Sequence, residues 1–287
     1  MSDFQFLKDK SGKWLISAPK RSARPNEANG DEPFCPFCPK TVDKETELYR
    51  TGGSGLSWKI LVVTNKYPFA PIHEIIIHSQ DHHKNFDELP LDQTEAIINT
   101  YRKRYNLHKS KGQVYIFHNK GEKSGESLVH PHTQLAVIAK KVKLDIPEMD
   151  RKDNTGVFDA GFFDIFCPKT SRWPDEVWVA PKNGGTHFGD ITDDEVHTFA
   201  KLIYRLVQIM DIRHGHEFSF NFYIYPGKDW YLRLIPREKI LGAFELGTSV
   251  IINTQDPKET FRFIEEHFNN PIVERIQENR AEYYRKA

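Results

Sequence analysis

The chain has 287 residues, of which 38% are hydrophobic and 28% charged. This composition is typical of a folded globular protein and excludes a disordered or fibrous chain. Forty basic residues balance forty acidic ones, so the net charge favours neither a nucleic acid nor a membrane surface as partner. The length fits one large unit or two domains of about 140 residues. No apolar run approaches the ~18 residues of a membrane helix.

Two of the three cysteines form a short motif near the N-terminus, Cys35 and Cys38 in Phe-Cys-Pro-Phe-Cys-Pro. Redox Cys-x-x-Cys pairs usually start a helix, which the prolines around this pair disfavour. The pair therefore predicts half of a tetrahedral metal shell. The candidates for the other ligands are His78, His82, His83 and His130. Three cysteines cannot form a disulfide framework, and the first residues lack a signal-peptide pattern, so we expect a cytoplasmic protein.

The first half reads as strands around one helix. The basic loop 20–25 precedes the cysteine pair. β-Branched and aromatic runs predict strands at 59–64, 74–78, 114–117 and 132–138. An apolar stripe at three- and four-residue spacing predicts a helix that begins near Asp87. The stripe consists of Ile97, Ile98, Tyr101 and Tyr105.

The second half repeats this order. It has a predicted strand at 177–180, a helix with an apolar stripe over 196–210, and strands at 218–225 and 230–235. We therefore expect two repeats, residues 1–150 and 151–287, joined by a charged linker at 148–161. Asp256-Pro257 predicts a terminal helix, which Pro271 ends before a charged tail. Many strands around few helices predict an α+β fold with a largely antiparallel sheet.

The most informative segment is 119–134, Asn-Lys-Gly-Glu-Lys-Ser-Gly-Glu-Ser-Leu-Val-His-Pro-His-Thr-Gln. Residues two apart on a strand share a face, so His130, His132 and Gln134 would line one side. An isolated His-x-His is more often a surface pair. The adjoining glycine loop, the cysteine pair and the arginine loop together favour a ligand site instead.

These motifs resemble the galactose-1-phosphate uridylyltransferase family, the transferase branch of the histidine-triad superfamily. The resemblance rests on the His130-Pro131-His132-x-Gln134 motif, the segments 119–121 and 21–25, the cysteine pair, Asp81-His82 and the segment 239–245. It implies two histidine-triad-like repeats, of which only residues 1–150 carry the zinc and the nucleophile. It also implies an active site built between subunits, and thus a homodimer.

Carried over residue by residue, the resemblance implies His132 as the nucleophile, with Gln134 and Ser127 at the transferred phosphoryl group. It implies a zinc ion held by Cys35, Cys38, His82 and His130, although the sequence separates His82 from His83 poorly. The residues implied at the nucleotide and its phosphates are Arg21, Arg24, Asn65, Asn119, Gly121 and Gly125. Those implied at the sugar phosphate are Lys239, Phe244 and Glu245.

The residue chemistry agrees with these roles. A neutral imidazole is a good nucleophile and, once phosphorylated, a good leaving group. Gln134 can hold a phosphate oxygen but cannot protonate a leaving group. The family's hydrolases carry, as the resemblance has it, a third histidine at that place, so transfer is favoured over hydrolysis.

Several positions depart from the family pattern. Residues 230–235 lack the histidines that hold a further metal in the family, so we expect no second metal there. Lys66 follows Asn65 where an acid often contacts the ribose, and Phe244 replaces a tyrosine. Thr133 is given no weight. Cys167 is expected to be a buried apolar residue, whereas His187, His214 and His216 are expected on the surface or in loops.

The leading hypothesis is a zinc-containing enzyme that exchanges UMP between a nucleotide sugar and a hexose 1-phosphate through a covalent nucleotidyl-histidine. One alternative keeps His132 but uses inorganic phosphate as acceptor, as in phosphorylases of ADP-sugars or dinucleoside polyphosphates. The other alternative is a non-catalytic, zinc-stabilised nucleotide-binding protein. Neither a nucleic acid nor a membrane is expected as a partner.

Overall fold

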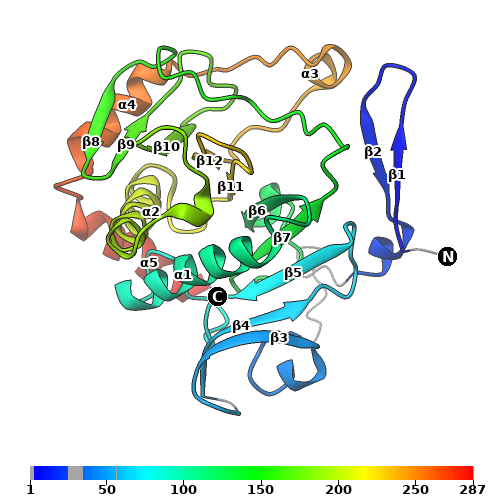
Figure 1. Ribbon diagram of the computed structural model, residues 1–287. Helices are drawn as coiled ribbons and strands as arrows, with labels where there is room; N and C mark the ends of the chain where they lie inside the picture. The colour runs from blue at the N-terminus through cyan, green and yellow to red at the C-terminus, as the bar shows by residue number, and fades with distance from the viewer. Residues whose placement is uncertain (1–2, 25–34, 56, 287) are drawn as a thin grey trace.

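The computed structural model describes residues 3–24, 35–55 and 57–286 (Figure 1). Ten strands form one sheet in the order β3-β4-β5-β7-β6-β11-β12-β10-β9-β8, and β1 and β2 form a separate pair. Every strand pairing is antiparallel. The predicted α+β fold with a largely antiparallel sheet is thus confirmed.

The bounds of the strands follow the chain. They are β1 Gln5–Lys8, β2 Trp14–Ser17, β3 Glu47–Gly52, β4 Trp58–Thr64, β5 Ile72–Ile77, β6 Gln113–Lys120, β7 His132–Ile138, β8 Val157–Ala160, β9 Phe163–Phe166, β10 Val177–Pro181, β11 Phe220–Ile224 and β12 Leu232–Pro236. The helices are α1 Leu91–His108, α2 Asp193–His214, α3 Ala243–Thr248, α4 Pro257–His267 and α5 Val273–Lys286.

The two halves of the large sheet share one strand order. Numbered from its own first strand, each half is ordered 1-2-3-5-4, with a long helix between its third and fourth strands. The halves meet where β6 pairs with β11. This repetition supports the expected division near residue 150, which stays a prediction.

The long helices cover one face of the sheet (Figure 1). The predicted stripe of α1 is buried in the main core, together with Phe199 and Ile203 of α2 and the helix-facing residues of the strands. A capping box of Thr192 and Glu195 starts α2, because the two side chains satisfy otherwise unpaired backbone N–H groups. None of the described helices is long and apolar enough to cross a membrane.

Strand alternation on β7 separates the site from this core. Leu135 and Val137 belong to the core under the helices, whereas Ala136 and Ile138 pack in a cluster on the opposite face. His132 and Gln134 share the face of Ala136, because side chains two apart point the same way. The cysteine segment lies on the same side of the sheet, where Cys35 and Phe37 pack against Leu61 of β4 and Ile75 of β5.

Two sequence expectations are wrong. The linker 148–161 contains strand β8, and the charged tail after Pro271 is helix α5. Both elements are largely exposed, so their sequences lack a strong apolar pattern. The expected helix start at Asp256-Pro257 is confirmed, because Asp256 caps α4 and Pro257 is its first residue.

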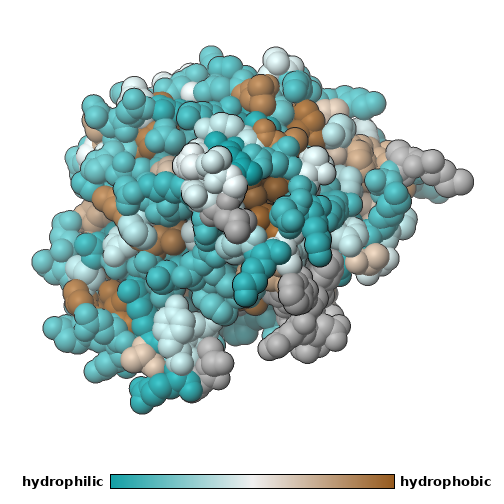
Figure 2. All heavy atoms as spheres, turned by 90° about the horizontal axis from the view of Figure 1, so that it is seen from below, coloured by the Kyte–Doolittle hydropathy of each residue, from teal (hydrophilic) through white to brown (hydrophobic). Residues whose placement is uncertain are grey.

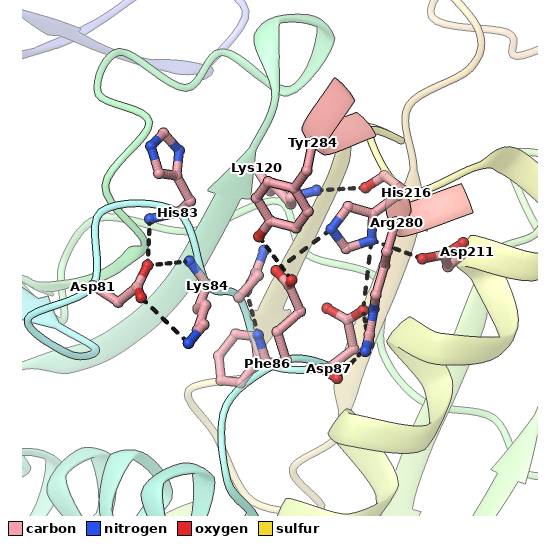
Figure 3. A network of polar contacts seen from close by, with 12 residues as sticks. Asp81, His83, Lys84, Phe86, Asp87, Lys120, Asp211, His216, Arg280 and Tyr284 are labelled. Carbon is pink, nitrogen blue, oxygen red and sulfur yellow. Dashed lines mark hydrogen bonds and ion pairs between the residues drawn. The ribbon is translucent and has the colours of Figure 1, made fainter. Parts of the chain in front are cut away.

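Helix α5 is attached mainly through polar contacts at its inner face (Figure 3). Asn279 donates to the backbone carbonyl and to the carboxylate of Asp211, at 2.9 and 2.7 Å. Arg280 donates to the carbonyl of Asp87 at 2.6 Å and to its carboxylate at 2.9 Å. These contacts tie the C-terminal helix to α2 and to the loop before α1. On the face seen in Figure 2, hydrophobic residues appear only in small separate groups.

His216 lies at the centre of this network, and the expectation that it is a surface residue is wrong. Its Nδ1 is 2.8 Å from a carboxylate oxygen of Asp211, and its Nε2 is 3.4 Å from Glu88. Burial disfavours the charged imidazolium, but the hydrogen bonds to Asp211 and Glu88 and the charge of Asp87 outweigh it. The pKa of His216 is therefore raised to about 9. The groups that face it from the neighbouring elements are Asp87, Glu88, Lys120, Asp211, Arg280, Tyr283 and Tyr284.

This pKa predicts a pH-dependent contribution to stability. A folded-state pKa above the ordinary value of 6.5 means that the contribution is complete below that value and is lost as pH rises through about 9. His216→Gln should lower the melting temperature at neutral pH and flatten its decline up to roughly pH 10. Thermal melts across this range, with His187→Gln as control, measure the difference. Parallel pH curves for wild type and His216→Gln would contradict the assignment.

Candidate functional site

A cysteine and histidine group lies beside the sheet. Cys35, Cys38, His82 and His130 each offer one ligand atom, and these four atoms all lie within 4.8 Å of one another. The cysteine turn is closed by Thr41, whose hydroxyl donates to the carbonyls of Cys35 at 2.5 Å and Cys38 at 3.0 Å. The structure thus contains a possible Cys/His metal site of the composition that metals such as zinc prefer.

The orientation of His130 fits a ligand role. Its Nε2 is 3.0 Å from the carbonyl oxygen of Ser79, which can only accept a hydrogen bond, so Nε2 carries the proton. Its Nδ1 lone pair then faces the sulfurs of Cys35 and Cys38, at 3.8 and 3.7 Å. Burial lowers the pKa of His130 to about 4, so the imidazole is neutral, as metal binding requires.

The structure separates the two neighbouring histidines that the sequence could not. Nδ1 of His82 lies 3.2 Å from the sulfur of Cys38, whereas His83 is exposed. The carboxylate of Asp81 accepts the backbone N–H groups of His83 and Lys84, both at 3.0 Å (Figure 3). This turn sends the two imidazoles in different directions, and only His82 reaches the thiols.

His132 begins strand β7 with a fixed tautomer. Its Nδ1 is 2.8 Å from the carbonyl oxygen of His130, so Nδ1 must be the protonated nitrogen. No hydrogen bond from the described residues reaches Nε2, which keeps its lone pair. Burial lowers the pKa of His132 to about 4. The side chain is therefore a neutral imidazole with one oriented, basic nitrogen, which is the form that acts as a nucleophile.

Gln134 is held by a residue that the sequence did not indicate, His73 on β5. The backbone N–H of Phe69 donates to Nδ1 of His73 at 3.3 Å, so Nε2 carries the proton and donates to Oε1 of Gln134 at 3.0 Å. Burial lowers the pKa of His73 to about 3, which keeps this pattern fixed. With its oxygen engaged, Gln134 presents its amide N–H groups as donors.

His132 and Gln134 line a cavity of about 150 Å³. Three further predicted residues, Arg24, Asn65 and Ser127, contribute to its wall. Arg21 lies next to it, because it donates to the carbonyl of Tyr67, another wall residue, at 2.6 Å. Pro25 of the same loop lies outside the described residues.

Lys66 and Glu45 meet in the wall of this cavity. The ammonium of Lys66 forms an ion pair with Glu45, whose side chain is only 4% exposed. A carboxylate is thus present beside Asn65, supplied by a residue 20 positions earlier in the chain. Sequence proximity could not indicate it, because the loop before β3 and the end of β4 are brought together only by the fold.

The glycine loop lies beside a second cavity, of about 390 Å³, which shares Ser127 and Leu128 with the first. Gly121 lines it and has a φ of 83°. A Cβ there would lie 2.2 Å from the hydroxyl of Ser219, so only glycine fits. Asn119 and Gly125 line neither cavity. The carboxamide oxygen of Asn119 instead accepts a hydrogen bond from Asn221 at 2.8 Å.

The residues expected at the sugar phosphate lie elsewhere in the chain's own fold. Lys239 donates to Glu245 at 2.8 Å, and Phe244 is 53% exposed. None of the three is among the described residues that line the cavity of His132. A single chain therefore does not bring them to the nucleophile.

The comparisons with known proteins agree with the motifs. Residues 72–137 match the family model described as galactose-1-phosphate uridyl transferase, N-terminal domain. An ADP-glucose phosphorylase of Arabidopsis thaliana is 23% identical, over 89% of this chain and 90% of the relative. A galactose-1-phosphate uridylyltransferase of Thermotoga maritima is also 23% identical, over 88% and 95%. The resemblance to the galactose-1-phosphate uridylyltransferase family is thereby confirmed.

Solved structures show the same fold as this uridylyltransferase-like chain. An ADP-glucose phosphorylase from Arabidopsis thaliana, solved with bound ADP-glucose, superposes with a TM-score of 0.71 and 21% identity, covering 92% of this chain and 99% of that one. A uridylyltransferase structure gives a TM-score of 0.73 and 20% identity, covering 93% and 99%. Uridylyltransferase and phosphorylase relatives are therefore similarly distant, and both are enzymes.

The second half of this uridylyltransferase-like chain carries an ion pair where further metal ligands occur in the family pattern. Arg233 on β12 donates to both carboxylate oxygens of Glu176, each at 2.8 Å, and to the hydroxyl of Tyr223 at 3.0 Å. Burial opposes the charged guanidinium, but Glu176 raises the pKa of Arg233. Cys167 is buried in the main core, as expected.

Proposed function

We propose that the protein is a nucleotidyltransferase in which Nε2 of His132 attacks the α-phosphorus of a nucleotide sugar. The observation that carries this proposal is the neutral imidazole of His132, whose Nδ1–H is bound by the carbonyl of His130 and whose side chain lines a cavity with Gln134. A fixed tautomer aims one lone pair, and positioning is what phosphoryl chemistry chiefly needs.

The transfer proceeds in two balanced displacements. In the first, a P–N bond forms at His132 while the bond from the α-phosphorus to the bridging oxygen breaks, releasing a sugar 1-phosphate. In the second, an acceptor phosphate oxygen attacks the same phosphorus and the P–N bond breaks, which returns the electron pair to Nε2. Arg24 and the donors of Gln134 and Ser127 compensate the charge on the phosphoryl oxygens.

The acceptor decides between the two leading activities. We propose exchange of UMP between hexose 1-phosphates as the reaction, and phosphorolysis by inorganic phosphate as the alternative, because relatives named for each activity are equally similar. Gln134 supports either transfer over hydrolysis, since a carboxamide does not protonate a leaving group. The pattern of hydrogen bonds at His132 supports both enzymes over a non-catalytic nucleotide-binding protein.

We propose that Cys35, Cys38, His82 and His130 hold one zinc ion. Two thiolates and two imidazoles with converging ligand atoms match a closed tetrahedral structural site. Zinc bound there supplies rigidity to the turn before His132, and no step of the transfer passes through it. A cytoplasmic location stays a prediction of the sequence.

We propose a homodimer in which the segment 239–252 of one chain reaches the His132 cavity of the other. This segment contains exposed apolar side chains, with 52–79% of their surface accessible: Ile240, Phe244, Leu246, Val250 and Ile252. Mixing inactive His132→Asn with an inactive Glu245→Gln protein should restore part of the turnover if the site is shared. A monomer, or no restoration after subunit exchange, would rule out the shared site.

The nucleophile is tested by a covalent adduct. Incubated with UDP-glucose or ADP-glucose alone, the wild type should gain the mass of one nucleoside monophosphate in an acid-labile linkage. His132→Asn should form none, whereas the control His197→Asn, on the exposed side of α2, should behave as wild type. Gln134→His should slow transfer and admit hydrolysis. Adduct on His132→Asn would remove His132 from this role.

Relaxed nucleotide selectivity is expected. The contacts that this cavity offers beside Asn65, Glu45 and its partner Lys66, are suited to a ribose, which UDP- and ADP-sugars share. We expect adduct formation from UDP-glucose, UDP-galactose and ADP-glucose to agree within roughly a hundredfold in kcat/KM. A uridine preference above roughly a thousandfold is the contrary result. A chase with hexose 1-phosphates or inorganic phosphate then identifies the acceptor.

Metal removal should destabilise the protein. We expect about one zinc per chain, and a lower melting temperature after chelation or in Cys38→Ser, because a structural zinc contributes several kcal/mol of folding free energy. Cys167→Ala is the matched control, since this cysteine is buried away from the group. Elemental analysis and thermal melts decide, and metal-free protein of unchanged stability would refute the zinc site.

A further inference from the structure

A polar cluster lies buried on the helix side of β7, directly behind the nucleophile. It consists of His78, Tyr101, His118 and Thr133, each no more than 1% exposed. The hydroxyl of Thr133 is 2.5 Å from that of Tyr101 and 2.8 Å from Nε2 of His78. Thr133, to which the sequence gave no weight, is thus the centre of a hydrogen-bonded group that does not line the cavity of His132.

His118 extends this cluster to the backbone of the nucleophile. Its Nδ1 is 2.8 Å from the carbonyl oxygen of His132, so Nδ1 carries the proton and donates. The ladder between β6 and β7 ends at the pair His118 and Thr133. Beyond that pair His132 has no ladder partner on the β6 side, and the imidazole of His118 takes the place of a backbone donor.

The surroundings of His118 keep its ring in place. The ring stacks on Phe222 with centroids 5.0 Å apart and on His78 at 5.3 Å, and the ring of Phe86 meets it edge-on at 5.4 Å. Burial lowers the pKa of His118 to about 3. The ring is therefore neutral, and its donor stays at Nδ1.

Stability alone does not account for this cluster. Nδ1 of His78 and Nε2 of His118 are buried without a hydrogen-bond partner among the described residues. Unsatisfied buried nitrogens are unfavourable, and an apolar side chain of similar size would pack here without that penalty. A polar group kept at such a place is typical of a functional constraint.

We propose that His118 is a positioning residue for His132, which fixes the nucleophile's peptide group from the far face of the sheet. The carbonyl of His130 holds the ring of His132, and His118 holds the carbonyl of His132, so two hydrogen bonds on opposite sides define where Nε2 points. The proposal rests on the proposed function in that the rate it affects is that of nucleotidyl transfer to His132.

Two variants of His118 separate positioning from folding. His118→Phe removes the donor but keeps an aromatic ring against Phe222. We expect an equal or higher melting temperature, unchanged affinity for UDP-glucose, and a single-turnover rate of adduct formation lowered on the order of tenfold. His118→Asn retains an amide N–H near the place of Nδ1 and should recover the rate to within about threefold of wild type.

A matched control comes from the other end of the same strand pair. Gln113 on β6 also donates to backbone carbonyls, those of Ala139 at 3.2 Å and Val142 at 2.8 Å. Gln113→Leu should leave the rate of adduct formation unchanged. If it slows the rate as much as His118→Phe does, the effect is general loosening of the sheet, and the positioning role is overturned.

A measurement without substrate distinguishes the two proposals. In ¹⁵N-histidine NMR spectra, His132 of the wild type should show one tautomer protonated at Nδ1, and His118→Phe should broaden or split its ring signals. Wild type that forms no adduct with either UDP-glucose or ADP-glucose refutes the proposed function, while the spectra still test the positioning. Unchanged spectra together with an unchanged rate in His118→Phe would overturn the role of His118.

Discussion

The candidate site depends on one dipeptide bend, His130-Pro131, which uses both ends of one residue. The ring of His130 turns its Nδ1 to the two thiols, while its carbonyl oxygen accepts the Nδ1–H of His132. Because proline cannot donate a hydrogen bond and restricts φ, the chain enters β7 along one path. Movement of the Cys/His group would therefore be transmitted to the tautomer and direction of His132, two residues away.

Neutrality of the imidazoles follows from where the sheet places them. His73, His118 and His132 are enclosed between packed side chains, and burial lowers the pKa of each to about 3 or 4. None of them titrates near neutral pH, so each has a fixed donor and a fixed lone pair. The positive charge that a phosphate needs is left to Arg21 and Arg24 on the N-terminal loop, and the sheet supplies oriented neutral groups.

Local patterns predicted the parts of this arrangement that are local in space. Alternation on a strand predicted that His132 and Gln134 share a face, and the Cys-x-x-Cys spacing predicted two converging thiols. The partners His73, Glu45 and His118 come from other strands and loops, and their contacts depend on the register of β5, β6 and β7, which no single segment specifies. His216 was misjudged for a related reason, because its partners come from the loop before α1, from α2 and from α5.

The repeated strand order places two equivalent positions in one sheet, and they have diverged in physical character. In the first half, β7 presents a neutral imidazole and a carboxamide to a cavity. In the second, the equivalent strand β12 presents Arg233, whose charge is matched by Glu176 with two hydrogen bonds. A buried, fully paired ion pair is unfavourable to break and offers no free lone pair. The second position thus contributes rigidity to the sheet, and the chemistry is left to the first.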